Sequence, residues 1–244
     1  MRLRRIFCIG DKLPRMAFDD ANILIFTGKD CARFLDGLSS NMIDFQSNSV
    51  IDTLVLSNRA KIIAQLHLFM LNDMLISISI CEDLVGLKNF LNSKILSQDV
   101  IINDVSELNY VDIVYDETIN DEPVLSLKET TIVTINNSYV FEMYSNKLTR
   151  KSLDGNAETF TDWRVNNLIP WYGYEVSSNR NPYQCGLNYQ VHENKGCFSG
   201  QEILTRMRTR EKGMYQLISQ SNKTIDLSKV STKGSEKSLI LQKI

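Results

Sequence analysis

One stretch near the C-terminal end of the chain decides how the rest of the sequence is interpreted. It is Lys195-Gly196-Cys197-Phe198-Ser199-Gly200-Gln201-Glu202. Glycines stand on both sides of Cys197 in this stretch. The apolar residues that follow, Ile203, Leu204 and Met207, recur at helical spacing. The stretch therefore predicts a glycine-containing loop that runs directly into a helix.

Cys197 is the candidate reactive group of this loop. The positive end of the helix dipole and the ammonium of Lys195 would both favour its thiolate, which is the nucleophilic and metal-binding form. Gly196 and Gly200 would let a ligand approach the backbone closely. The alternative is that Cys197 is a small buried hydrophobic residue and that the glycines only shape a turn. Spacing alone leaves both interpretations open.

Composition indicates an ordinary globular protein. The chain has 244 residues, of which 43% are hydrophobic and 23% charged, so it can bury one large core or two modest ones. Its 27 Lys and Arg nearly balance its 29 Asp and Glu, which leaves no excess positive charge for binding nucleic acid. No stretch approaches the roughly 20 apolar residues that cross a bilayer. We therefore expect neither a nucleic-acid partner nor a membrane.

The cysteines indicate a reducing compartment. They lie at positions 8, 31, 81, 185 and 197, an odd number without a C-x-x-C pair. This pattern argues against a disulfide framework and against a preformed zinc site. The basic and briefly apolar N-terminus is too short for a signal-peptide core. A cytoplasmic location with reduced thiols is the expectation.

Hydrophobic patterning predicts an α+β fold. Apolar runs and alternation predict strands over 22–28, 62–70, 75–80, 100–102, 111–114, 131–135 and 139–143. Helices are expected after Asp30, as N-cap, and over 82–96. The polar stretch 145–158 marks a boundary, and beyond it six aromatic residues crowd between Trp163 and Tyr189. Ordinary packing explains such a cluster as well as a binding pocket does.

The quoted stretch resembles the K-G-C-Y-x-G-Q-E signature of the YgfZ family, the folate-binding relatives of the glycine-cleavage T-protein that serve the maturation of iron-sulfur enzymes. Residues 26–35 resemble the family's first strand and its G-x-D-A-x-x-F-L helix. Residues 56–64 resemble its L-x-x-K-G-R-x-x-A turn, with Ala60 where the family usually has Gly. Further matches are Arg164, Ile169-Pro170, Tyr172-Gly173, Glu175 and Pro182. The resemblance thus covers most of the chain.

This resemblance implies the T-protein fold. Residues 1–45 with 155–215 would form a discontinuous folate-binding-type domain, and 46–150 a ferredoxin-like α+β domain between them. The family's C-terminal β-barrel needs about 80 to 100 residues. Only some 30 residues follow Lys212, so 216–244 would be a remnant of the barrel or a tail.

The resemblance also implies a function and a site. The chain would be a folate-binding accessory protein for assembly or repair of iron-sulfur clusters, with Cys197, assisted by Lys195, as transient thiolate ligand or redox thiol. The accompanying motif residues are Gly196, Phe198, Gly200, Gln201 and Glu202, and the tetrahydrofolate-binding residues would be Phe160, Arg164, Tyr172, Glu175 and Arg206. A cluster needs about four protein ligands, so carrier or client proteins would be the partners.

Two other functions stay open at this point. A tetrahydrofolate-dependent aminomethyltransferase would share the fold, but Ala64-Gln65 stands where those transferases have paired aspartates. Neither side chain carries a proton at neutral pH. A non-catalytic interaction module is the other alternative. Ala21 stands where some relatives place a stacking Trp, and Asn166 where many have a Glu that faces the pterin donors.

Two further features of the sequence can be interpreted as structural or as functional. The basic run of Arg206, Arg208, Arg210 and Lys212 is either a solvated helix face or a docking surface for an acidic partner. His67 and His192 stand far apart in the sequence, with no evident catalytic or metal-ligand set around them. We expect both histidines to be structural or exposed.

Overall fold

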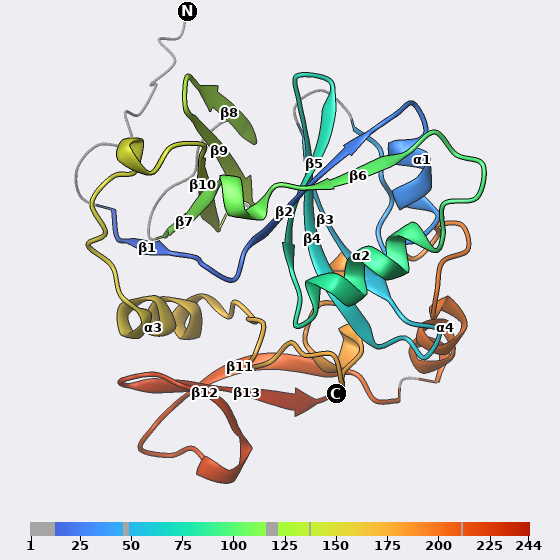
Figure 1. The fold of residues 1–244 in the computed structure, drawn as a ribbon. Helices are drawn as coiled ribbons and strands as arrows, with labels where there is room; N and C mark the ends of the chain where they lie inside the picture. The colour runs from blue at the N-terminus through green and yellow to red at the C-terminus, as the bar shows by residue number, and fades with distance from the viewer. Residues whose placement is uncertain (1–12, 46–48, 116–121, 137, 211) are drawn as a thin grey trace, which may run out of the picture.

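The structure is a computed structural model that describes residues 13–45, 49–115, 122–136, 138–210 and 212–244. The predicted α+β class is confirmed, with three antiparallel sheets and four α-helices among the described residues (Figure 1). Within the same residues, no helix is long and apolar enough to span a membrane. Cys8 lies outside the described residues.

The first sheet has the strand order β3-β4-β5-β2-β6. Its strands are β2 (Asn22–Thr27), β3 (Val50–Leu56), β4 (Ile62–Leu71), β5 (Met74–Ile80) and β6 (Ile101–Asp104). The predicted hairpin is β4 with β5. Asn72 and Asp73 form its two-residue turn with φ of 49° and 60°, the left-handed geometry that matches strand twist in hairpins.

Helices α1 (Cys31–Asp36) and α2 (Leu84–Asn92) cover one face of this sheet, where Leu24, Leu66 and Leu87 are buried in one core. Asp30 does stand at the N-cap of α1, but its side chain accepts from the Asp99 amide at 2.8 Å instead of capping the helix. Helix α2 is shorter than the predicted 82–96. It ends where the Ser93 hydroxyl turns back to bond the Phe90 carbonyl.

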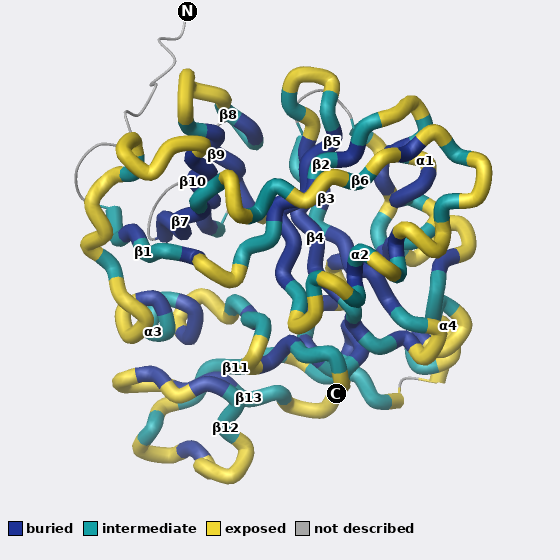
Figure 2. The backbone as a smooth tube through the Cα atoms, in the orientation of Figure 1, coloured by how far each residue is buried: buried dark blue, intermediate teal, exposed yellow. Residues whose placement is uncertain are grey.

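The second sheet has the order β1-β7-β10-β9-β8 and packs against the other face of the first. Its strands are β1 (Arg15–Ala17), β7 (Tyr110–Val114), β8 (Val124–Leu127), β9 (Thr130–Ile135) and β10 (Tyr139–Tyr144). Phe69, Ile78 and Phe141 belong to the core between the two sheets. Most of the residues coloured as buried in Figure 2 belong to these two sheets.

The C-terminal residues form a third, smaller sheet of order β11-β13-β12. Its strands are β11 (Tyr215–Ser221), β12 (Val230–Lys233) and β13 (Lys237–Lys243), and they lie below α3 (Ala157–Asn167) in Figure 1. Helix α4 (Gln201–Thr209) lies on the opposite side of the molecule from α3 (Figure 1). Short 3-10 helices occur at Ser106–Leu108, Lys147–Thr149, Pro182–Gln184, Asn188–Gln190 and Leu227–Lys229.

The sheets do not follow the predicted division of the chain at residue 45. Strand β2 comes from the segment 1–45, yet it pairs with β5 and β6 from the segment 46–150. Hydrogen bonds define sheets and not independently folding units, so the boundaries 1–45 with 155–215, 46–150 and 216–244 stay predictions.

Candidate functional site

The loop that carries Cys197 leads into α4, as the sequence predicts. Gly200 is the N-cap and Gln201 the first helical residue, so Cys197 lies three residues before the cap. The Gln201 amide N–H donates to the Phe198 carbonyl, and its side-chain Nε2 donates to the Lys195 carbonyl, both at 3.2 Å. Phe198 is buried in the core beside the first sheet, whereas Cys197 is exposed. The loop is thus closed on itself and presents the thiol to solvent.

Gly200 fixes this loop to the turn between β3 and β4. Its φ is +80°, and a Cβ at this position would lie 2.6 Å from Ala60 Cα and 2.8 Å from the Ser57 carbonyl oxygen. No other residue type fits such an approach. The structure therefore brings together the two stretches that resemble family motifs, 56–64 and 195–202. Ala60 itself has φ 57°, in the left-handed region that favours Gly.

Lys195 anchors the other end of the loop. Its Nζ donates to Asp36 Oδ1 and to the Asn41 carbonyl, each at 2.8 Å, and to the Asp36 carbonyl. This places a cation at the C-terminal end of α1, where the helix dipole favours one. Burial lowers the pKa of Lys195, and the hydrogen bond that Lys195 donates to the Asp36 carboxylate offsets this lowering only in part. A direct effect of Lys195 on the Cys197 thiol stays a prediction.

Exposure singles out Cys197 among the described cysteines. Cys31 and Cys185 are buried and Cys81 is half-buried. Burial raises the pKa of Cys81 to about 11 and that of Cys185 to about 12, so both stay protonated thiols near neutral pH. Among the described residues, no group of three or more His, Cys, Asp or Glu could hold a metal ion. The predicted metal-ligand role of Cys197 stays a prediction.

Arg164 and Glu175, two of the residues predicted to bind folate, form a buried pair that contacts β12 of the third sheet. Arg164 Nη1 donates to Glu175 Oε2 at 3.3 Å, and Nη2 donates to Thr232 Oγ1 at 3.4 Å. The hydroxyls of Ser231 and Thr232 each donate to Glu175 Oε1 at 2.6 Å. Strand β12 therefore supplies partners that a ligand would otherwise provide.

The remaining predicted folate residues divide into two places. Phe160 packs in the aromatic cluster, with its ring centroid 4.9 Å from that of Trp171 and 5.9 Å from the Arg164 guanidinium carbon. Tyr172 is half-buried, its hydroxyl has no hydrogen-bond partner among the described residues, and burial raises its pKa to about 12. Arg206 lies on α4, across the molecule from α3 (Figure 1).

These placements do not fit a folate held by the predicted set. A ligand that used the polar atoms of Arg164 and Glu175 would have to displace β12. Asn166 is exposed on α3, and Ala21 is half-buried. Arg206 lies on α4, a different helix from the one that carries Arg164. We therefore derive no chemistry through folate from these residues.

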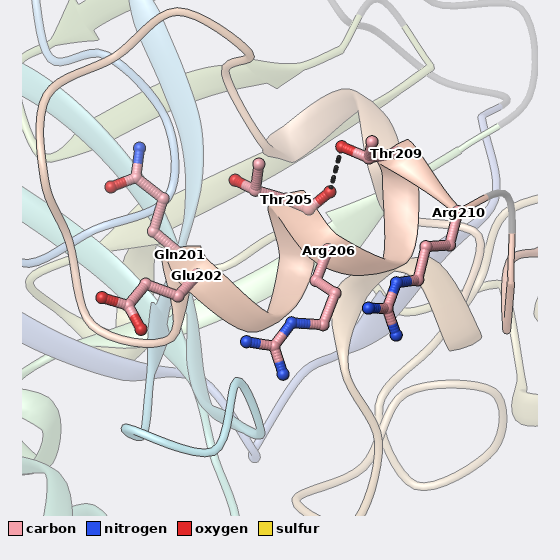
Figure 3. A pocket seen from close by; sticks show the side chains of 6 residues that line it. All are labelled: Gln201, Glu202, Thr205, Arg206, Thr209 and Arg210. Carbon is pink, nitrogen blue, oxygen red and sulfur yellow. Dashed lines mark hydrogen bonds between the residues drawn. The ribbon is translucent and has the colours of Figure 1, made fainter.

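A hollow along α4 was not predicted from the sequence. Its volume is about 480 Å³, and Figure 3 shows the side chains that line it, which are Gln201, Glu202, Thr205, Arg206, Thr209 and Arg210. The spacing of Arg206 and Arg210, one helical turn apart, is the sequence signal that could have indicated this face. Only the first part of the basic run is helical. Helix α4 ends at Thr209, before Arg210 and Lys212.

His67 is buried and paired, so it has the structural role that was one of the two expectations for it. Its Nδ1 lies 2.7 Å from Asp52 Oδ1, and its Nε2 is buried without a partner among the described residues. Asp52 and Tyr189 line a separate hollow of about 410 Å³. Cross-strand register explains the pair, since Asp52 on β3 stands opposite His67 on β4. Separation by 15 residues hid this contact from the sequence.

Comparisons with known proteins show the fold. No protein-family model matches the sequence, and no curated protein matches it. The structure is similar to the crystal structure of glycine cleavage system aminomethyltransferase T from Bartonella henselae, with a TM-score of 0.74 and 11% sequence identity. The match covers 93% of this chain and 78% of that one. The expected T-protein-like fold is therefore confirmed, and membership of the YgfZ family stays a prediction.

Proposed function

We propose that this chain is an accessory protein for the assembly or repair of iron-sulfur clusters, of the YgfZ kind, and that Cys197 is its working thiol. One observation carries the proposal. Cys197 is exposed on a loop that is held at both ends, whereas the other described cysteines are buried or half-buried. A thiol that must meet a cluster or a second thiol has to be reachable, and Cys197 is.

The chemistry that one such thiol supports is transient. A cluster takes about four protein ligands, so Cys197 contributes one and a carrier or client protein contributes the others. The cluster is then cargo that passes through the site. In the thiol-exchange form of the proposal, the Cys197 thiolate attacks a disulfide or persulfide sulfur on the partner, and the partner's second sulfur leaves with the electron pair. A cytoplasmic, reducing location belongs to this proposal.

Folate has no step in this proposal, because Arg164 and Glu175, two of the charged residues of the expected pocket, are bonded to each other and to β12. Calorimetric titration with tetrahydrofolate tests this exclusion. We expect no binding heat and no thermal shift. A shift that grows with folate concentration would show binding to the folded state by mass action and would overturn the exclusion.

A second candidate function is the aminomethyltransferase, which the similarity to a solved enzyme of that kind favours. Ala64 and Gln65, where transferases have paired aspartates, are both buried on β4, and neither can move a proton. Release of formaldehyde from an aminomethyl donor distinguishes the two functions. Folate-dependent release of formaldehyde that persists after replacement of Cys197 would favour the transferase function over the thiol function.

The proposal itself is tested in cells that lack the native protein. These cells receive the wild-type chain, Cys197→Ala or the control Cys81→Ala, whose thiol is half-buried. We expect cluster-dependent enzymes to lose most of their activity with Cys197→Ala and to keep it with Cys81→Ala. Enzymes without a cluster should be unaffected throughout. Full activity of cluster-dependent enzymes with Cys197→Ala, at equal protein level, would reject the proposal.

A further inference from the structure

Two exposed arginines share one face of α4. Arg206 and Arg210 stand one turn apart, both line the hollow, and their guanidinium groups point to the same side in Figure 3. Within the described part of the chain, neither has an ion-pair partner. Arg208, between them in sequence, projects from another side of the helix and pairs with Glu193 at 3.3 Å. The same face also carries the Glu202 carboxylate, one turn before Arg206, so it has two arginines and one acid and is basic on balance.

Two like charges at this spacing are unfavourable in the free protein. Their repulsion costs about 0.2 to 0.5 kcal/mol on a helix surface. The C-terminal end of the helix favours cations and offsets part of this repulsion, but it supplies no partner for the hydrogen-bond donors of Arg206 and Arg210. A partner that supplies carboxylates would remove the repulsion, and guanidinium groups bind carboxylates through paired hydrogen bonds.

The basic face is continuous with the Cys197 loop. Gln201, which lines the near end of the hollow, donates from Nε2 to the Lys195 carbonyl and so closes the loop around Cys197. From Gln201 to Arg206 is five residues, roughly 8 Å along the helix axis at about 1.5 Å per residue. Gln201 therefore borders both the hollow and the loop that carries Cys197.

We propose that this face of α4 docks an acidic segment of the protein with which Cys197 exchanges a cluster or a sulfur. Carboxylates of the partner lie on Arg206 and Arg210, and a hydrogen-bond donor of the partner faces Glu202. This inference rests on the proposed function, because it names the partner of the same thiol. Two arginines match a short run of carboxylates, whereas nucleic acid is bound through many Lys and Arg contacts, for which this chain has no excess of positive charge.

Disulfide exchange with two synthetic peptides tests the docking. Both carry one cysteine activated as a mixed disulfide with 5-thio-2-nitrobenzoate, next to a block of four Glu in one peptide and four Gln in the other. The Cys197 thiolate attacks the peptide sulfur, the old disulfide breaks, and the coloured nitrobenzoate thiolate leaves. The full chain carries Cys8→Ser, and mass spectrometry confirms the peptide on Cys197. Cys197→Ser gives the background rate.

The Glu peptide should react about tenfold faster than the Gln peptide at low salt, through electrostatic steering and docking. We expect this preference to fall to about one in Arg206→Gln/Arg210→Gln and to persist in the matched control Arg208→Gln. Circular dichroism and thermal midpoints establish that all three chains are folded. Added chloride should reduce the preference.

The outcomes separate this inference from the proposed function. Equal rates for both peptides, or a preference that survives Arg206→Gln/Arg210→Gln, would overturn the docking surface and leave the thiol function standing. Preference abolished by inorganic phosphate, at an ionic strength where chloride does not abolish it, would show a small-anion site and also overturn it. No reaction of either peptide at Cys197 would contradict both proposals.

Discussion

Gly200 is the residue of the signature with the least conformational choice. Its positive φ and the 2.6 Å approach to Ala60 Cα both require that it have no side chain. We predict that Gly200→Ala lowers the free energy of unfolding by about 3 kcal/mol, from left-handed strain plus overpacking against backbone. Urea denaturation followed by circular dichroism measures this.

Gly196 provides the matched control for this substitution. A Cβ on Gly196 would meet no other atom within 4 Å, and its φ is not in the left-handed region. Gly196→Ala should therefore change the free energy of unfolding by no more than about 0.5 kcal/mol. Equal effects of the two substitutions would contradict the packing of the loop on the β3–β4 turn.

Asp36 gives the loop anchor a pH dependence. Burial raises its pKa, but hydrogen bonds from Lys195 and from the Ile43 amide outweigh burial, and the net pKa lies below its usual range. An acid with a lowered folded pKa stabilises the protein above its unfolded pKa, about 3.9, and loses this as pH falls through the folded value.

We therefore predict how wild type and Asp36→Asn compare across pH. The wild type should be the more stable at neutral pH, and the difference should vanish as Asp36 becomes protonated below its unfolded pKa of about 3.9. Chemical denaturation at a series of pH values measures the difference. A difference that stays constant down to the acid limit would show that the Asp36 carboxylate is not the group involved.

At the residue scale, the sequence indicated which residues are important but not which residues they contact. The loop into α4 and the importance of Gly200 follow from local spacing and from the motif. The bonds of Lys195 do not, because Asp36 and Asn41 lie 159 and 154 residues away in sequence. Only the fold brings the C-terminal end of α1 to the signature.

Among the elements, β12 depends most on a single charge pair. Glu175 accepts from both Ser231 and Thr232 and pairs with Arg164, and Arg164 and Glu175 are both buried. Glu175→Gln leaves the Arg164 guanidinium buried without a counter-charge. We predict a loss of about 3 kcal/mol in the free energy of unfolding, with faster amide hydrogen exchange in the third sheet than in the first.

Asp226→Asn is the control for this element. Asp226 is exposed and caps the short 3-10 helix Leu227–Lys229 just before β12. Its substitution should leave exchange in β12 and β13 unchanged. If Glu175→Gln left the third sheet as protected as Asp226→Asn does, the pair would not be what fixes β12 to α3.

Elements with strong periodicity were predicted, and polar or short ones were not. The hairpin of β4 and β5 alternates clearly, and its turn residues are typical. Strands β1 and β8 are short and lie at the edges of their sheet. In β12 the buried residue is Thr232, whose burial depends on a hydroxyl bond to Glu175. Its sequence therefore lacks the apolar signal of a strand.

At the scale of the whole molecule, the chain returns to its first sheet to place the thiol. After β10 it passes through one 3-10 helix, α3 and two further 3-10 helices, and the 195–202 loop then packs on the β3–β4 turn. No local pattern encodes this return, and the family resemblance grouped 155–215 with 1–45, whereas the β3–β4 turn lies in 46–150. The basic face of α4 and the burial of Arg164 with Glu175 depend on where whole elements lie, which the sequence did not reveal.

Cys197 is the reachable thiol among the described cysteines of the folded protein, and graded modification measures this directly. The native chain is treated with limiting maleimide, and the labelled peptides are identified by mass spectrometry, which also separates Cys8. Among Cys31, Cys81, Cys185 and Cys197, we predict that Cys197 is labelled first and that the others react only on unfolding. Protection of Cys197 while one of those three is labelled in the folded protein would contradict this prediction.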